Sequence, residues 1–186
     1  MKVLLFLSVP VGLALLATPA MSQDKKGAKT DEPGPVHEKL AKLAGEYTTV
    51  AAFRIKPDQP PMESPGAAKI TSVMGGRFIL EENSGTTFGD KFTGLRLIGF
   101  NNATGQYEAS WSYSRSTAIM LMTGTSKDDG KTIDWSGSFA TGKDDKMVLH
   151  VTTRIVSNDR FEVELIAKMP DGSKGPTLLT TYTRKK

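Results

Sequence analysis

From residue 46 to the C-terminus, apolar and polar residues alternate along short runs, and this period of two limits the possible folds more than any other feature. The clearest run covers residues 161–169, where Phe, Val, Leu and Ala alternate mainly with charged residues. Because successive side chains of a strand point to opposite faces, the run predicts a strand with one buried and one solvated face. Similar runs cover residues 47–55, 107–113 and 133–139, and residues 92–100 form a dense apolar stretch.

Turn-forming pairs separate these runs at hairpin-like intervals. They include Gly75-Gly76, Gly89-Asp90, Asp129-Gly130 and Asp171-Gly172. No segment between the predicted strands is long and periodic enough for a crossover helix, so the sheet is expected to be antiparallel and mostly up-and-down. An open sheet of about ten strands leaves long exposed edges, which closure into a barrel or folding into a sandwich removes. We predict an all-β barrel of about ten antiparallel strands.

One short helix is predicted in front of the first strand. Pro35 suits a first helical turn, and Gly45 ends the segment. Between them, Leu40 and Leu43 belong to an apolar pattern with three- and four-residue spacing. Residues 23–34 are polar, of mixed charge and rich in Lys, Asp, Gly and Pro, which is typical of a disordered spacer. A single β-barrel domain is therefore expected over residues 35–186.

Residues 1–22 have the composition of a secretory signal peptide. Lys2 supplies a positive start and residues 3–17 are largely apolar. Ala20 and Ser22 then place cleavage before Gln23. The apolar run is shorter than the roughly 20 residues that span a bilayer, and the chain has no cysteine for a lipid anchor. We expect an exported protein, periplasmic or extracellular, without a membrane anchor.

The absence of cysteine also excludes disulfides, thiolate metal sites and a cysteine nucleophile. The formal net charge of +4 comes from the chain ends, because residues 35–183 contain 17 basic and 17 acidic side chains. With no basic stripe in that region, nucleic acid is not expected as a partner.

Several segments resemble a known family. They read GGRFILEENSG (residues 75–85), GFNNATGQYEASW (99–111), RST (115–117) and TYTRK (181–185). Over residues 36–185 the chain is similar to the bacterial domain of unknown function family 1579. The resemblance implies a calycin-like barrel, related in shape to lipocalins, and implies no particular activity.

The resemblance also implies how the barrel closes. In calycins a Gly-x-Trp starts the first strand, and a basic residue of the last strand stacks on that Trp. Here Tyr47 stands in place of the Trp, and Arg184 is the expected partner. A guanidinium over a tyrosine ring is still attractive, by about 0.5–2 kcal/mol. The pair is expected to be structural.

A candidate ligand pocket follows from the alternation around residues 110–122. Trp111, Tyr113 and Arg115 share one face, and with Met120 and Met122 they can line an apolar cavity that has a few polar contacts. The alternative is that these side chains simply fill the barrel.

Arg96, within an apolar strand, either faces solvent or needs a buried anion such as Glu82 or a ligand carboxylate. His150 can serve as a haem ligand or a general base if it faces inward, and is otherwise an ordinary strand histidine. His37, in the helix, is interpreted as a solvated or packing residue.

Three functions remain open at this point. The first is a binding protein that holds a small apolar or amphipathic molecule inside the barrel. The second is an enzyme that uses the same cavity, with Glu81 or Glu82 and His150 as its candidate groups. The third is a structural barrel without a ligand. No recognisable nucleophile, metal set or cofactor motif is present in the sequence, which favours the first. We assign no catalytic residue, metal or cofactor, apart from the haem option at His150. The sequence leaves the oligomeric state open.

Overall fold

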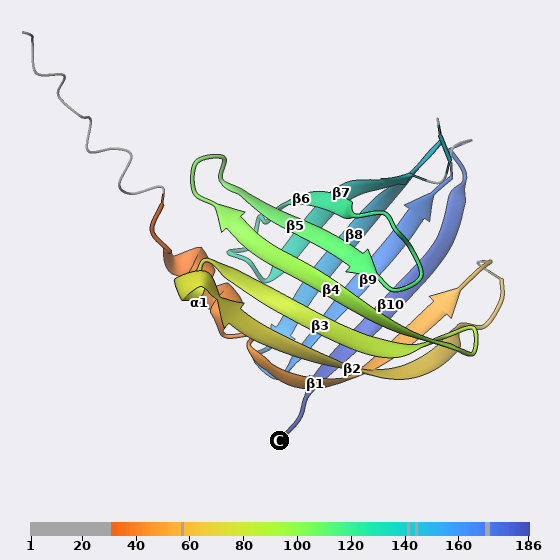
Figure 1. Ribbon diagram of the computed structural model, residues 1–186, viewed down its shortest axis with the longest axis horizontal. Helices are drawn as coiled ribbons and strands as arrows, with labels where there is room; N and C mark the ends of the chain where they lie inside the picture. The colour runs from red at the N-terminus through yellow and green to blue at the C-terminus, as the bar shows by residue number, and fades with distance from the viewer. Residues whose placement is uncertain (1–30, 57, 141, 144, 170–171) are drawn as a thin grey trace, which may run out of the picture.

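The computed structural model describes residues 31–56, 58–140, 142–143, 145–169 and 172–186. The predicted signal peptide and most of the predicted spacer lie outside these residues. The described chain forms a closed antiparallel barrel in which consecutive strands are neighbours and the last strand pairs with the first (Figure 1). This confirms the prediction of an up-and-down barrel and rules out the sandwich.

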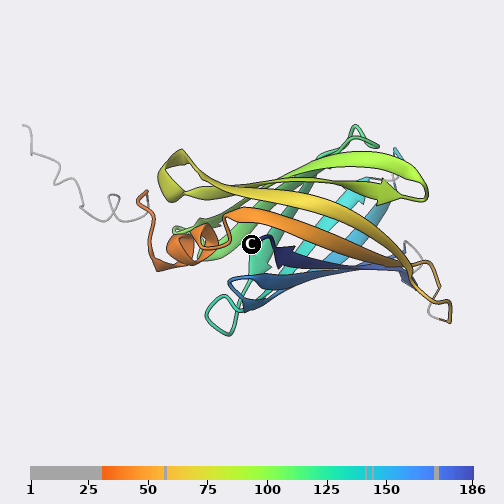
Figure 2. The same ribbon diagram turned by 90° about the horizontal axis from the view of Figure 1, so that it is seen from below.

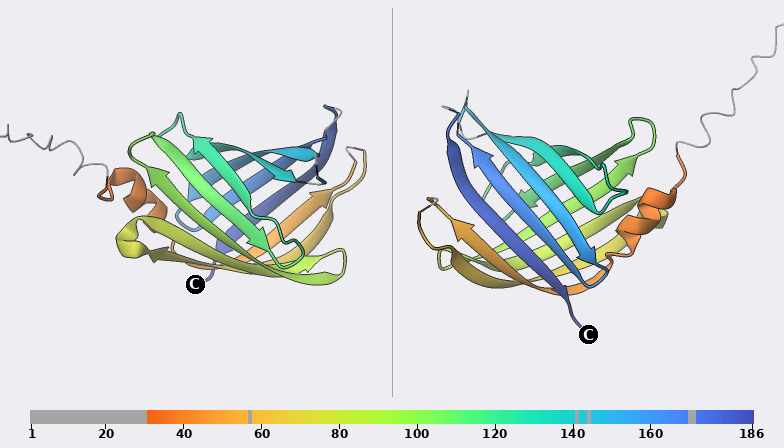
Figure 3. Two further views of the ribbon diagram at one scale, coloured as in Figure 1. Left: turned by 45° about the horizontal axis from the view of Figure 1, so that its top comes forward. Right: turned by 180° about the vertical axis from the view of Figure 1, so that it is seen from behind.

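Within the described residues, ten strands make the wall, in an order around the barrel that follows the chain. They are β1 (Gly45–Arg54), β2 (Met62–Val73), β3 (Phe78–Thr87), β4 (Asp90–Asn101), β5 (Gln106–Tyr113), β6 (Met120–Thr125), β7 (Thr132–Ala140), β8 (Lys146–Ser157), β9 (Arg160–Lys168) and β10 (Lys174–Arg184). A 3-10 turn, η2 (Met74–Gly76), joins β2 to β3. Seen from behind, β8, β9 and β10 lie side by side (Figure 3).

The short helix α1 (Pro35–Ala41) covers the end of the barrel at which β1 begins (Figures 1 and 2). Its buried face carries His37 and Leu40. The Gly34 N–H donates to His37 Nδ1 over 3.0 Å, and the other ring nitrogen lies 2.9 Å from the Phe100 carbonyl, to which it donates. His37 is thus a buried packing residue that ties the start of the helix to β4, which agrees with one of its two interpretations.

Arg184 joins the last strand to the start of the first strand at this end of the barrel. Its guanidinium lies 4.9 Å from the centre of the Tyr47 ring, and the two residues are register partners on β10 and β1. Nη1 of Arg184 donates to the Ala44 carbonyl over 2.6 Å, and Nη2 donates to the Lys42 carbonyl over 3.0 Å. A side chain at Gly45 would collide with this guanidinium. The arrangement is the one that the family resemblance implies for this pair.

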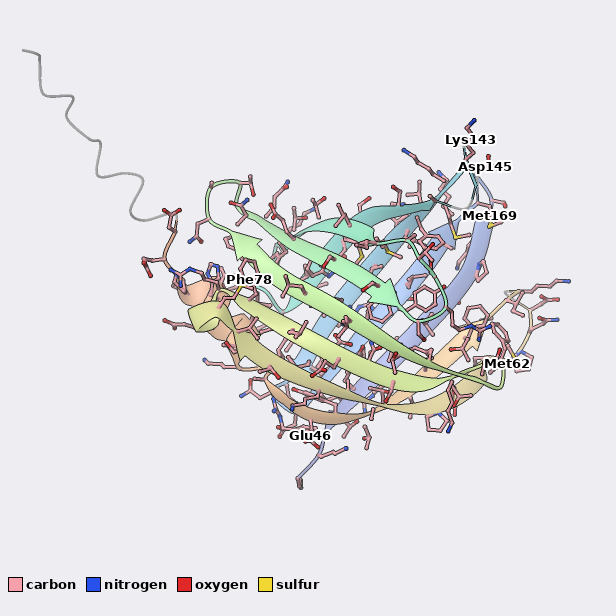
Figure 4. The ribbon with its side chains drawn as sticks, in the orientation of Figure 1. Glu46, Met62, Phe78, Lys143, Asp145 and Met169 are labelled. Atoms are coloured by element: carbon pink, nitrogen blue, oxygen red, sulfur yellow. The ribbon has the colours of Figure 1, made fainter. Side chains whose placement is uncertain are left out.

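The two ends of the barrel differ in how tightly their inward-facing side chains pack. Near α1 these side chains are buried and mostly aromatic or aliphatic; they include Tyr47, Ile79, Tyr107, Ile133, Trp135, Phe161 and Tyr182. At the opposite end the inward-facing side chains keep accessible surface; they include Phe53, Phe92, Trp111, Tyr113, Phe139, Met147, Leu165 and Leu178. Figure 4 shows the two ends, with Phe78 beside α1 and Met62 and Met169 at the other end. We call the second part of the interior the open half.

Candidate functional site

A buried polar cluster lies inside the barrel. Glu81 on β3 and Arg96 on β4 are register partners, and both point inward. Arg96 Nε donates to Glu81 Oε2 over 2.9 Å, and Arg96 Nη2 donates to the same oxygen. The Tyr182 hydroxyl on β10 donates to Glu81 Oε1 over 2.8 Å. Glu81 is 1% exposed, Arg96 9% and Tyr182 5%, so the cluster carries one paired ion of each sign and no net charge.

The surroundings of the cluster fix the protonation states of Arg96 and Tyr182. Burial lowers the pKa of Arg96, but the charges and hydrogen bonds of Glu81 and Tyr182 together outweigh burial and leave the pKa raised. Burial raises the pKa of Tyr182, and the negative charge of Glu81 raises it further. The guanidinium therefore stays charged and the phenol stays neutral at any physiological pH.

Asn83 extends the cluster toward the open half along the same face of β3. Its Nδ2 donates to Glu81 Oε1 over 3.1 Å. Its carbonyl oxygen, Oδ1, is buried and accepts no hydrogen bond from the described part of the chain. A methyl group added at Gly94 would lie 2.5 Å from this oxygen and 2.7 Å from the Trp111 ring. The bare backbone of Gly94 thus leaves the space in which the Asn83 amide and the Trp111 ring lie together.

The predicted pocket residues of β5 and β6 share this interior. Trp111 is the register partner of both Arg96 and Met120, and Met122 follows on the same face of β6. The Trp111 and Tyr113 rings stack with centroids 6.3 Å apart and planes 23° from parallel. Met120 and Met122 are buried, whereas Trp111 and Tyr113 keep accessible surface. Five of the residues predicted to bind a ligand, Arg96 among them, therefore face the barrel interior.

Arg115 does not join them, so the prediction that it shares their face is wrong. The alternation of β5 stops at Tyr113, and Arg115 lies in the exposed connection that follows. Its Nη2 forms an ion pair with Asp90 at 3.1 Å, and its Nη1 donates to the Thr87 carbonyl over 3.0 Å. Arg115 ties the β5–β6 connection to the β3–β4 turn.

His150 also lies outside the interior. It is exposed on the outer face of β8, between the buried, inward-facing Leu149 and Val151. It therefore cannot supply a haem ligand or a base inside the barrel. Glu82 is likewise exposed, and the anion that pairs with Arg96 is Glu81 instead. Of the groups named for an enzyme, Glu81 faces inward and His150 faces outward, and the outward-facing Glu82 is on β3, which is not a neighbour of β8 in the sheet.

Outside the barrel, two shallow grooves of about 500 and 430 Å³ cross the outer face of β2–β5. Both are lined by Ser84, Thr93 and Ser114. They offer little apolar surface that is shielded from solvent, and we place the candidate site in the interior instead. Within the described ranges, no three His, Cys, Asp or Glu side chains gather as a metal site would require. No helix in those ranges is long and apolar enough to cross a membrane.

The fold and the site define a class: a closed up-and-down, calycin-like barrel, covered by a helix at one end, with a buried polar cluster inside. The chain matches the model of the family described as "Protein of unknown function (DUF1579)" over residues 32–184, and it belongs to that family. This confirms the family resemblance found in the sequence.

Solved structures support the fold. The S-type phycobiliprotein lyase CPES from Guillardia theta has 14% sequence identity and a TM-score of 0.55, with 81% of this chain and 93% of that chain covered. Rv2717c from M. tuberculosis has 14% identity and a TM-score of 0.59, with 83% and 100% covered. At this identity the likeness shows the fold alone. A search among curated protein sequences finds no significant match.

Proposed function

We propose that this protein is an exported carrier or receptor that binds one small amphipathic molecule in the open half of its barrel. The apolar part of the molecule contacts the inward-facing aromatic and aliphatic side chains, and its polar end reaches the Glu81–Arg96–Tyr182 cluster. The observation that carries the proposal is the unequal packing of the interior. Side chains such as Phe53 and Leu178 face inward and are only half-buried, directly beyond a polar cluster that is fully enclosed.

A purely structural barrel would be expected to fill its interior, because apolar surface left in contact with water forfeits about 25 cal/mol per Å². A pocket for a small molecule instead combines apolar walls with a few converging polar groups, which is the composition found here. The buried ion pair points the same way. Such pairs add little to stability compared with apolar residues of similar size, so stability alone does not explain Glu81 and Arg96.

Export rests on the sequence of residues 1–22, with its positive start, apolar run and small residues before Gln23. Expression of the full chain, followed by N-terminal sequencing of the secreted or periplasmic product, tests this part of the proposal. A mature protein that begins at Gln23 supports it. An uncleaved cytoplasmic product refutes it.

Native mass spectrometry of the protein purified from its own producing cells tests the binding function. We expect a fraction of the protein to carry a single small-molecule adduct that organic solvent releases. Leu178→Trp, which adds bulk to the open half, should abolish the adduct. Leu179→Trp is the matched control, because Leu179 is the next residue of β10 and lies on the outer face, where it is 38% exposed. An adduct unaffected by Leu178→Trp would contradict the location, and an empty wild-type barrel would favour the structural alternative.

A further inference from the structure

We infer that the bound molecule presents a neutral hydrogen-bond donor, a hydroxyl or an N–H group, to Asn83 Oδ1. The ligand is then an uncharged amphipathic alcohol, amide or arylamine, and not a carboxylate such as a fatty acid. This inference rests on the proposed function and specifies the chemistry of the same site.

The charges of the cluster argue against an acidic ligand. Within the described ranges, Arg96 is the only buried side chain among the lysines and arginines, and two of its nitrogens already donate to Glu81. A carboxylate that approached Arg96 would have to lose its own hydration and lie beside the Glu81 carboxylate. Like charges at short distance inside a protein strongly disfavour each other. A cationic ligand gains little either, because Glu81 is already paired.

The acceptor that remains is Asn83 Oδ1. The orientation of its amide is set by the Nδ2 hydrogen bond to Glu81, because a flipped amide would place its oxygen against the carboxylate. Oδ1 is thereby left as a buried acceptor without a donor from the described protein. Buried acceptors are nearly always hydrogen-bonded in folded proteins, and an unmade bond is unfavourable. A ligand O–H or N–H supplies the missing donor.

The surroundings of Oδ1 place the apolar part of the ligand as well. The Trp111 ring lies over Gly94 next to Asn83, and Tyr113 stacks on Trp111 further along the same face of β5. A donor that reaches Oδ1 therefore brings its attached carbon skeleton against the two rings. Flat or extended apolar groups suit this contact, because aromatic faces bury large area with little loss of conformational freedom.

A displacement assay distinguishes the ligand classes. The reporter is N-phenyl-1-naphthylamine, a neutral fluorescent probe with one N–H, and the competitors are dodecanol and dodecanoate at pH 8, which share a chain length. We expect dodecanol to displace the probe with an affinity at least about tenfold higher than that of dodecanoate, the effect of roughly one hydrogen bond and one avoided charge burial. Asn83→Leu removes the hydrogen bond but keeps the Glu81 carboxylate, so it should weaken dodecanol binding about threefold or more and leave dodecanoate binding unchanged. Ser84→Leu, on the outer face of β3, should leave both affinities unchanged.

The possible results separate the inference from the proposed function. If dodecanoate binds as tightly as dodecanol, or if Asn83→Leu folds and binds dodecanol as tightly as the wild type, the inference is wrong while interior binding stands. A water molecule on Oδ1 would give this second result. If neither competitor displaces the probe and the purified protein carries no adduct, the proposed function itself fails. Should Asn83→Leu not fold, Asn83→Thr and the ratio measured on the wild-type protein still decide the question.

Discussion

Removing the positive charge at Arg96 is the sharpest test of how the interior cluster is built. Arg96→Met keeps an unbranched apolar stem at this position but leaves Glu81 without its cation. Two unit charges about 4 Å apart attract by about 4 kcal/mol at an effective dielectric constant of about 20. Loss of one partner of a buried pair typically lowers the free energy of unfolding by about 3–5 kcal/mol. Because Glu81 is 1% exposed, we expect a value in this range.

The companion variant replaces the whole cluster. Glu81→Leu, Arg96→Met and Tyr182→Phe together remove the ion pair and the phenol that donates to it, so no charge is left buried. Replacing buried ion pairs with well-packed apolar residues is often neutral or stabilising. We expect this triple variant to recover most of the stability lost in Arg96→Met, and at the same time to lose probe binding.

Equilibrium unfolding in urea, followed by tryptophan fluorescence and circular dichroism, measures both variants. A change of midpoint without a change of slope would show that stability alone has altered. The reasoning is refuted if Arg96→Met loses less than about 1 kcal/mol, since the pair would then not be buried and uncompensated. It is also refuted if the triple variant is as unstable as Arg96→Met, because the cluster would then serve the fold and not the ligand.

Three further predictions concern single residues. Burial raises the pKa of Tyr182 above its value of about 10 in the unfolded chain. The neutral phenol therefore contributes its full stability below pH 10, and this contribution falls by about 1.4 kcal/mol per pH unit above pH 10. Between pH 9 and 11.5 the urea midpoint should fall less steeply with pH for Tyr182→Phe than for the wild type, and an equal fall in both proteins would contradict this. Gly94→Ala places a methyl group 2.5 Å from Asn83 Oδ1. We expect the variant to lose about 1–3 kcal/mol of stability and to bind the naphthylamine probe more weakly. Wild-type stability and affinity would contradict the described packing around Gly94. Arg184→Met removes the donors to the Ala44 and Lys42 carbonyls. We expect it to lower stability by about 2–3 kcal/mol, which is measured as a lower Tm. A decrease in Tm of less than about 2 °C would show that the contacts of Arg184 are dispensable for closing the barrel.

Much of the fold could be predicted from the sequence because its signals are local. Alternation within each run marks the strands, and short turns between them require antiparallel neighbours. The same reasoning failed at Arg115 because alternation indicates a face only while the strand continues, and β5 ends two residues earlier. The outward position of His150 had a usable signal, since Leu149 and Val151 on either side of it are apolar and must share the opposite face.

The pairing of Glu81 with Arg96 depends on where the β3–β4 turn is centred. Register partners Thr87 and Asp90 flank a turn made of Phe88 and Gly89, both of which have positive φ, the conformation of a type I′ hairpin. The sequence favours Gly89-Asp90 as the turn, and a shift of one residue moves every cross-strand partner by two. Glu81 would then face Ile98 and not Arg96.

The contact of Tyr182 with Glu81 could not be predicted from any local pattern in the sequence. It is separated from Glu81 by 101 positions in the chain and reaches it only because β10 closes the barrel against β1. Such contacts depend on the stagger between strands around the whole barrel, which no single run of residues encodes.

The central claim, that a small molecule binds in the open half, is tested most directly by the methyl resonances of methionine. In an NMR titration with N-phenyl-1-naphthylamine, Met120 and Met147 report on the interior, whereas Met74, which is 67% exposed at the α1 end, is an internal control. The account predicts saturable shifts of Met120 and Met147 at a one-to-one ratio, with Met74 unchanged. Shifts confined to Met74, or shifts that do not saturate, would contradict it.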